Sequence, residues 1–173
     1  MEQAGEDEHY KSVYAEFGLA IYLAQCLEHA IVNALMFVDL IPHANKSAAS
    51  SNEWRDLFDT YIGERFGFTL GKLLGELKRV MPVDSGLAQS LADALKLRNF
   101  LAHAFFRERA ELFLSHSGRE AMIQELVKAQ ESFQHVETLL AETIQPAQLE
   151  LGFTPEALKA YRDSWARANG FEL

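Results

Sequence analysis

The most constraining feature of this chain is a helical repeat of apolar residues that a single arginine interrupts. Between residues 84 and 106, apolar side chains recur at alternating steps of four and three, the spacing of one helix face. The members of this series are Leu87, Leu91, Ala94, Leu101 and Phe105. Arg98 occupies the position between Ala94 and Leu101 where the repeat would place another apolar residue. Because a helix turns by about 100° per residue, the guanidinium is directed toward the packed interface.

An arginine in this position needs a polar partner. An unpaired charge taken out of water costs on the order of several kcal/mol, so we expect a carboxylate, a phosphate or a wet cleft opposite Arg98. Arg98, Asn99 and His103 are expected to line one flank of this helix. From the residues alone, two interpretations are open. Arg98 either extends along the apolar face with its head in water or belongs to a functional site.

The six residues from Arg98 to His103, Arg-Asn-Phe-Leu-Ala-His, resemble the Arg-Asn-x-x-x-His signature of the HEPN superfamily. This superfamily consists of small all-helical domains and includes many ribonucleases of toxin and antiviral systems. The preceding segment, Phe68 to Leu77, is similar to the helix that leads into the motif in some bacterial members. One toxin branch has a functional tyrosine two residues after the histidine, and Phe105 stands at that position here.

The resemblance implies a metal-independent endoribonuclease that acts as a homodimer, with two Arg/His motifs in one cleft. It makes Arg98 and His103 catalytic residues, makes Asn99 a supporting residue, and implies no cofactor and no metal. Histidine titrates near neutral pH and can move a proton at a ribose hydroxyl or a leaving oxygen. Arginine offers a planar set of donors for charge on phosphate oxygens. The implied setting is a toxin–antitoxin or phage-defence system, with an antitoxin or another partner protein.

The charge of the chain limits how it can bind RNA. The 173 residues carry a formal net charge of -9, and an acidic surface repels polyanions unless basic residues gather locally. Four basic residues surround the motif: Lys96, Arg98, Arg107 and Arg109. Neighbouring carboxylates partly offset their charge. This pattern favours transient cleavage over tight binding.

The acidic net charge is also compatible with two other functions. One is a non-catalytic helical interaction module, such as an antitoxin or partner subunit, in which Arg98 pairs with an acidic residue of the bundle. The other is a nucleotide-binding domain without hydrolysis.

Helical apolar periods along the chain predict an all-α fold in one domain, residues 1–173. We expect an up-and-down bundle of four main helices with an accessory C-terminal helix within 154–170. The long helix at 119–144 is expected to pair antiparallel with a neighbour. Residues 1–7 are predicted to be disordered, and Pro42 to Asn52 to form a loop. The other expected helices span 8–38, 53–66, 69–80 and 84 to about 114.

Further features predict a cytoplasmic protein without a membrane span. The single cysteine, Cys26, lies in an apolar helical pattern and cannot form an intrachain disulfide. The N-terminal segment is acidic, unlike a signal peptide. The most apolar region, 17–41, contains polar side chains that would be costly in a bilayer. Glu131 and His135 lie one helical turn apart but lack the second Glu/His pair that a di-iron bundle site requires.

Overall fold

The protein was analysed as a computed structural model that describes residues 2–47 and 50–171, and side chains within 8–45 and 50–171. Every regular element in these residues is helical, which confirms the predicted all-α class. The elements are α1 (Glu2–Leu35), the π-helix η1 (Met36–Leu40), α2 (Ile41–Ser47), α3 (Ser51–Phe66), α4 (Leu70–Val80), α5 (Ser85–His103), α6 (Phe105–Glu108), α7 (Ala110–Phe113), α8 (His116–Glu150) and α9 (Pro155–Ala168). Residues 1 and 48–49, parts of the predicted disordered start and loop, lie outside the described residues.

The first helical run, α1 followed directly by η1 and α2, is longer than predicted at both ends. α1 begins at Glu2, so the disordered start predicted for 1–7 is wrong over 2–7, where acidic residues suit the positive end of a helix. A loop was predicted from Pro42, which lacks the N–H that a helix interior uses. Instead the backbone widens into η1, where the N–H of Ile41 donates to the carbonyl of Met36, five residues back. α2 then continues to Ser47, so the predicted loop is wrong over 42–47.

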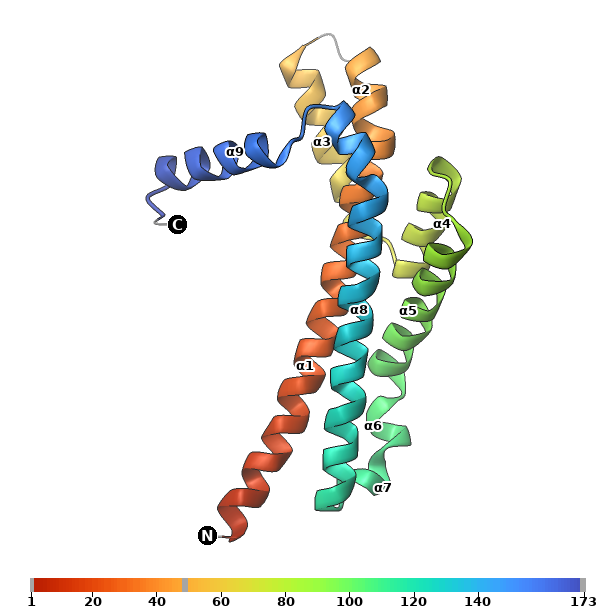
Figure 1. The fold of residues 1–173 in the computed structure, drawn as a ribbon, viewed down its shortest axis with the longest axis vertical. Coiled ribbons are helices and arrows are strands. Elements are labelled where there is room, and N and C mark those ends of the chain that lie inside the picture. Colours follow the sequence, from red (N-terminus) through yellow and green to blue (C-terminus); the bar gives the residue numbers. More distant parts are fainter. Residues whose placement is uncertain (1, 48–49, 172–173) are drawn as a thin grey trace.

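The helices alternate in direction along the long axis of the molecule (Figure 1). α1 and α8 lie side by side and share the largest helix–helix contact. They run parallel, because Gln130 bonds Glu16 near one end while Phe153 packs against Phe37 near the other. The predicted antiparallel pairing is therefore wrong for this contact. Antiparallel pairing does hold between α8 and α5, because the first turns of α5 adjoin residues 139–143 in the second half of α8.

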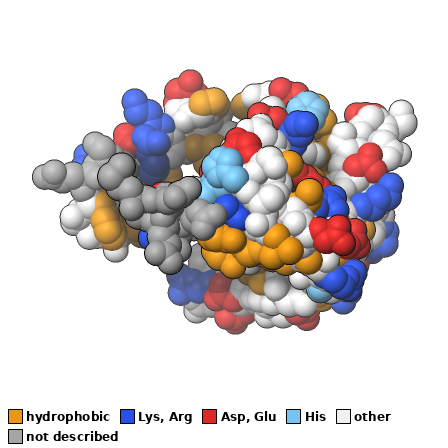
Figure 2. Space-filling view, turned by 90° about the horizontal axis from the view of Figure 1, so that it is seen from below, with side chains coloured by type: hydrophobic (Ala, Val, Ile, Leu, Met, Phe, Trp, Pro, Cys, Tyr) orange, Lys and Arg blue, Asp and Glu red, His pale blue; other side chains and the backbone are white. Residues whose placement is uncertain are grey.

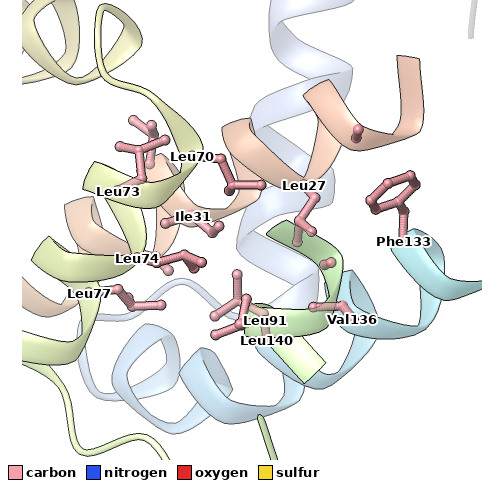
Figure 3. Packing of buried hydrophobic residues seen from close by; sticks show 14 of the residues in the cluster. Leu27, Ile31, Leu70, Leu73, Leu74, Leu77, Leu91, Phe133, Val136 and Leu140 are labelled. Carbon is pink, nitrogen blue, oxygen red and sulfur yellow. The ribbon is translucent and has the colours of Figure 1, made fainter. Parts of the chain in front are cut away.

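The core forms where α1, α4, α5 and α8 meet (Figure 3). The apolar periods seen in the sequence supply it, since each helix turns one stripe inward. The most enclosed side chains there include Leu27, Ile31, Leu70, Leu73, Leu77, Leu91, Leu126 and Phe133.

The helix starts follow the side-chain capping rules. Ser50 caps α3 in a reciprocal capping box with Glu53. Asp84 caps α5, because its Oδ1 accepts from the N–H groups of Gly86 and Leu87 at 2.7 and 2.9 Å.

α8 runs past its predicted end near Ile144 and contains Pro146. An internal proline costs about 3 kcal/mol in a typical helix, so packing has to offset it. Ile144 is buried, and Leu151 and Phe153, just beyond the helix, also pack on the core. α9 then leaves the bundle and extends away from it (Figure 1).

The stretch Glu8–Asn45 is long and apolar enough to cross a membrane by length and composition alone. The central core helix of a soluble protein meets the same criterion. Here Leu27, Ile31 and Leu35 of this stretch are fully enclosed by the neighbouring helices.

Candidate functional site

The motif lies at the end of α5, where the helix stops abruptly. His103 is the last residue of α5, and Ala104, at φ -131°, breaks the helical backbone. The chain then turns so that Phe105 enters the core, 1 % exposed. The single helix predicted from 84 to about 114 is therefore divided into α5, α6 and α7. The break leaves His103 exposed at a helix end.

Arg98 has the carboxylate partner that its place in the apolar stripe demanded. Its Nε donates a hydrogen bond to Oε1 of Glu28, on α1, over 3.2 Å. The two side chains are 32 % and 20 % exposed, so the pair sits in the edge of the α1–α5 contact and not deep in the core. The terminal guanidinium nitrogens of Arg98 have no further partner among the described residues. They remain available to an anion.

Asn99 and His103 are exposed and make no hydrogen bond within the described part of the chain. On an ideal helix, the Cα atoms of Arg98 and His103 lie roughly 8–9 Å apart and about 140° around the axis. The structure thus carries all three motif residues on accessible parts of α5 but pairs none of them with another. Arg98 and His103 therefore do not share the single flank expected from the sequence, and a phosphate held by both would have to bridge two flanks of α5.

The predicted basic group around the motif is balanced by carboxylates. Each of its four cations lies within salt-bridge distance of an acid: Lys96 with Asp93 at 2.9 Å, Arg98 with Glu28 at 3.2 Å, Arg107 with Glu108 at 3.5 Å, and Arg109 with Glu125 at 2.7 Å. Hydrogen bonds from Gln89 and Lys96 lower the pKa of Asp93, and the bidentate bond to Glu125 raises the pKa of Arg109. The motif region therefore presents little net positive charge.

Aromatic side chains connect the segment after the motif to α1. Phe106 lies 4.8 Å from Phe17 and 5.7 Å from Tyr14, measured between ring centroids. Along the outward face of α1, Tyr14 and Tyr22 are 55 % and 59 % exposed, and a Cβ added at Gly18 between them would meet no atom within 4 Å. Of these exposed residues, Tyr14 is the one in contact with the segment that follows the motif.

Sequence reasoning missed a buried arginine at the start of α8. Arg119 is 1 % exposed; its Nε donates to Nδ1 of His9 at 3.3 Å and its Nη1 to the carbonyl of Phe113 at 3.1 Å. The guanidinium also stacks on Tyr10 at 4.1 Å. The apolar repeat of α8 begins at Met122, one turn after Arg119, so the sequence pattern did not indicate that Arg119 is buried. At this end of the molecule, charged side chains of both signs flank a hydrophobic band (Figure 2).

A second polar network, also missed, holds α3 against η1. The hydroxyl of Tyr61 donates to Oδ2 of Asp39 at 2.9 Å and approaches the carbonyl of Leu35 at 3.3 Å. Arg65 stacks on the Tyr61 ring and pairs with Glu76 at 3.4 Å. Burial and the bond to Asp39 raise the pKa of Tyr61. This network joins α3 to the π-helix but leaves the buried Nε of Arg65 without a hydrogen-bond partner. No sequence period reveals the irregular backbone of the π-helix.

Three surface hollows of the described residues lie away from the motif. Within the described residues, no three His, Cys, Asp or Glu side chains are placed to hold a metal ion. The surface hollows on α8, between α8 and the start of α5, and on α9 are lined by other residues than Arg98, Asn99 and His103. Comparisons with protein-family models, curated proteins and solved structures found no match to this chain.

Proposed function

We propose that this chain is a HEPN-like, metal-independent endoribonuclease that works as a homodimer, in a toxin–antitoxin or phage-defence setting. In this proposal α1, α4, α5 and α8 make up the four-helix bundle, in which α1 and α8 run parallel rather than in the expected up-and-down order, and α9 is its accessory helix. The observation that supports it best is the surface position of the motif. Arg98 keeps free terminal nitrogens at the α1–α5 edge, and His103 is exposed at the end of α5.

In the proposed reaction, the ribose 2′-hydroxyl loses its proton and its oxygen attacks the adjacent phosphorus. The bond to the 5′-oxygen breaks, and that oxygen takes up a proton. His103 transfers one of these protons, and Arg98 donates to the phosphate oxygens as their charge grows. The products are a 2′,3′-cyclic phosphate and a 5′-hydroxyl. Glu28 acts as a positioning residue, because it holds Arg98 by Nε and leaves the guanidinium fork open.

The homodimer would place an arginine and a histidine on the same phosphate, which the two motif residues of a single chain do not do. Arg98 and His103 lie on different flanks of α5, so a second motif facing the first would offer an arginine and a histidine to the same phosphate. Tyr14, exposed on α1, packs against Phe106 just after the motif and gives two copies apolar area to bury.

One observation favours the non-catalytic interaction module as a second candidate. All four cations around the motif are paired with carboxylates inside the chain, and Arg98 has the acidic bundle partner that this alternative requires. In that case the Arg98–Glu28 pair joins α5 to α1, and RNA is repelled by the net charge of -9.

The deciding experiment is incubation of purified protein with RNA in excess EDTA. Wild type is expected to cut the RNA, and His103→Ala to lose about 10²–10⁴-fold in rate, the usual contribution of acid–base catalysis. His135→Ala is the matched control, because His135 is also an exposed histidine on a helix. Equal cutting by wild type and His103→Ala, or no cutting by either, would remove the enzymatic function and leave the interaction module.

A further inference from the structure

α3 is attached to the bundle without contributing to its buried core. Among the 16 residues of α3, all of which the structure describes, Arg65 is the one that is buried. Trp54, Tyr61 and Ile62 pack on the edge of the core and stay partly exposed. The buried apolar cluster takes side chains from α1, η1, α2, α4, α5, α6 and α8, and none from α3. Release of α3 would therefore leave every side chain of that cluster in place.

The contacts that hold α3 are mainly polar. The hydroxyl of Tyr61 donates to Oδ2 of Asp39, on η1, at 2.9 Å. Nη2 of Arg65 donates to Oε2 of Glu76, on α4, at 3.4 Å and lies 3.9 Å from Oδ2 of Asp39. The buried Nε of Arg65 has no hydrogen-bond partner among the described residues. We call these four residues, Asp39, Tyr61, Arg65 and Glu76, the α3 polar contact.

Water can replace much of what the α3 polar contact provides. Charged groups regain their hydration when they are exposed, so an ion pair adds little net stability to the closed arrangement. The unpaired Nε of Arg65 favours release, because it would bind water once exposed. Buried apolar side chains gain nothing comparable from water. α4, with only 11 residues, buries four leucines, so its release costs more free energy than the release of α3.

The ends of α3 allow it to move as one unit. Ser50 and Glu53 form a capping box, so the start of α3 is satisfied within its own segment. α4 has a separate cap, because Oγ1 of Thr69 accepts from the N–H of Lys72 at 3.4 Å. The first turn of α4 thus does not depend on α3 for its hydrogen bonds.

α3 covers the π-helix and the adjoining turns of α1. The hydroxyl of Tyr61 also approaches the carbonyl of Leu35, where α1 passes into η1. Phe66, the last residue of α3, packs edge-on against His29 of α1, with ring centroids 4.9 Å apart. His29 follows Glu28, the partner of the motif arginine. Release of α3 would uncover irregular backbone and the surface of α1 next to that ion pair.

We propose that α3 is a flap that opens and closes as a unit over the π-helix, while α1, α4, α5 and α8 stay folded. The α3 polar contact holds the flap closed. Flap opening does not depend on RNA cleavage, and amide exchange measures it directly. Failure of the flap and failure of the nuclease therefore give different results.

Hydrogen–deuterium exchange of the full chain at pH 7 tests this opening. Amides of α3 are expected to exchange about a hundredfold faster than those of residues 126–136 in α8, because they need only a local opening. Urea below the unfolding transition should speed exchange in α8 much more than in α3, since the release of one helix exposes little surface. Equal exchange rates in the two helices, or an equal response to urea, would overturn the proposal.

Three variants separate the flap from the core. Glu76→Gln removes the charge that pairs with Arg65 and should speed exchange in α3 about tenfold. Arg79→Gln is the matched control, because it removes the exposed second partner of Glu76, 3.1 Å away, and should leave exchange in α3 unchanged. Val136→Ala weakens core packing that persists when the flap is open, so it should speed exchange in α8 alone. Unchanged α3 exchange in Glu76→Gln, or faster α3 exchange in Val136→Ala, would contradict a flap held by the α3 polar contact.

Discussion

The Nε of Arg98 donates a hydrogen bond to Oε1 of Glu28, 3.2 Å away, and so links α5 to α1 across seventy residues of sequence. This pair explains how a guanidinium is tolerated in an apolar stripe, because the carboxylate supplies the charge that the packed surface lacks. It also leaves one side of the guanidinium open, since only Nε is engaged.

Arg98→Lys separates the two functions proposed for this residue. A lysine keeps the positive charge near Glu28 but lacks the planar fork that can hold a phosphate at two points. We expect RNA cleavage in EDTA to fall by about 10²–10³-fold, as for the loss of a transition-state donor. We expect the free energy of unfolding to change by less than about 1 kcal/mol, as for a partly exposed ion pair. Cleavage at the wild-type rate would show that Arg98 has only a structural role.

Glu28→Gln tests the positioning role from the other side of the pair. The amide oxygen can still accept from Nε, but the negative charge that competes with phosphate is removed. Unfolding in urea should show a loss of about 1 kcal/mol, because a charge-assisted bond becomes a neutral one. RNA retention in a filter-binding assay should rise, and Glu125→Gln, which unpairs Arg109 instead, provides the comparison. Weaker RNA retention by Glu28→Gln alone would mean that Glu28 does not restrain Arg98 in the proposed way.

Gly118→Ala tests the close packing of Gly118, in the first turn of α8, against the backbone of Leu112. A Cβ at this position would collide with the backbone of Leu112, which cannot yield as a flexible side chain can. We expect the free energy of unfolding to fall by about 1–3 kcal/mol, as for overpacking.

Gly75→Ala is the matched control for that change. Gly75 lies in the exposed face of α4, and its added Cβ would meet nothing within 4 Å. This variant should gain up to about 1 kcal/mol from helix propensity. Equal destabilisation of the two variants would show that the close approach at Leu112 is not the cause.

Tyr61 should make stability depend on alkaline pH. Burial and the bond to Asp39 raise its folded pKa, whereas in the unfolded chain the phenol titrates near the ordinary value of about 10. The unfolded state therefore loses a proton first as pH rises, and stability, complete below about pH 10, falls above it. Tyr61→Phe should cost about 1 kcal/mol at neutral pH and show a shallower loss between about pH 9.5 and 11. Parallel stability curves for the two proteins in urea titrations would refute this role of Tyr61.

Side-chain periodicity predicted most of the core, because each helix buries one stripe regardless of its neighbour. Leu91 of α5 and Leu126 and Phe133 of α8 are buried as their spacing indicated. The helix ends predicted at Val38 and near Ile144 were wrong, since a π-turn and anchoring contacts beyond the helix offset the defects at Pro42 and Pro146. These compensations are tertiary and leave no periodic signal.

The candidate site was predictable only in part for the same reason. The position of Arg98 in an apolar stripe correctly required a partner, but Glu28 could be identified only once α1 and α5 were placed side by side. Likewise, the basic residues near the motif were visible in the sequence, whereas the bond between Arg109 and Glu125 depends on how α6 and α7 fold back onto α8.

The most direct test of the central claim is the RNA-cleavage rate, in EDTA, of a purified heterodimer with Arg98→Ala in one chain and His103→Ala in the other, isolated through two different affinity tags. If the two motifs form one reaction centre, this heterodimer should cut RNA while homodimers of either variant are inactive. A heterodimer as inactive as both homodimers, beside an active wild type, would contradict a centre shared by two chains. Cleavage by all four proteins at the same rate would contradict any catalytic role for Arg98 and His103.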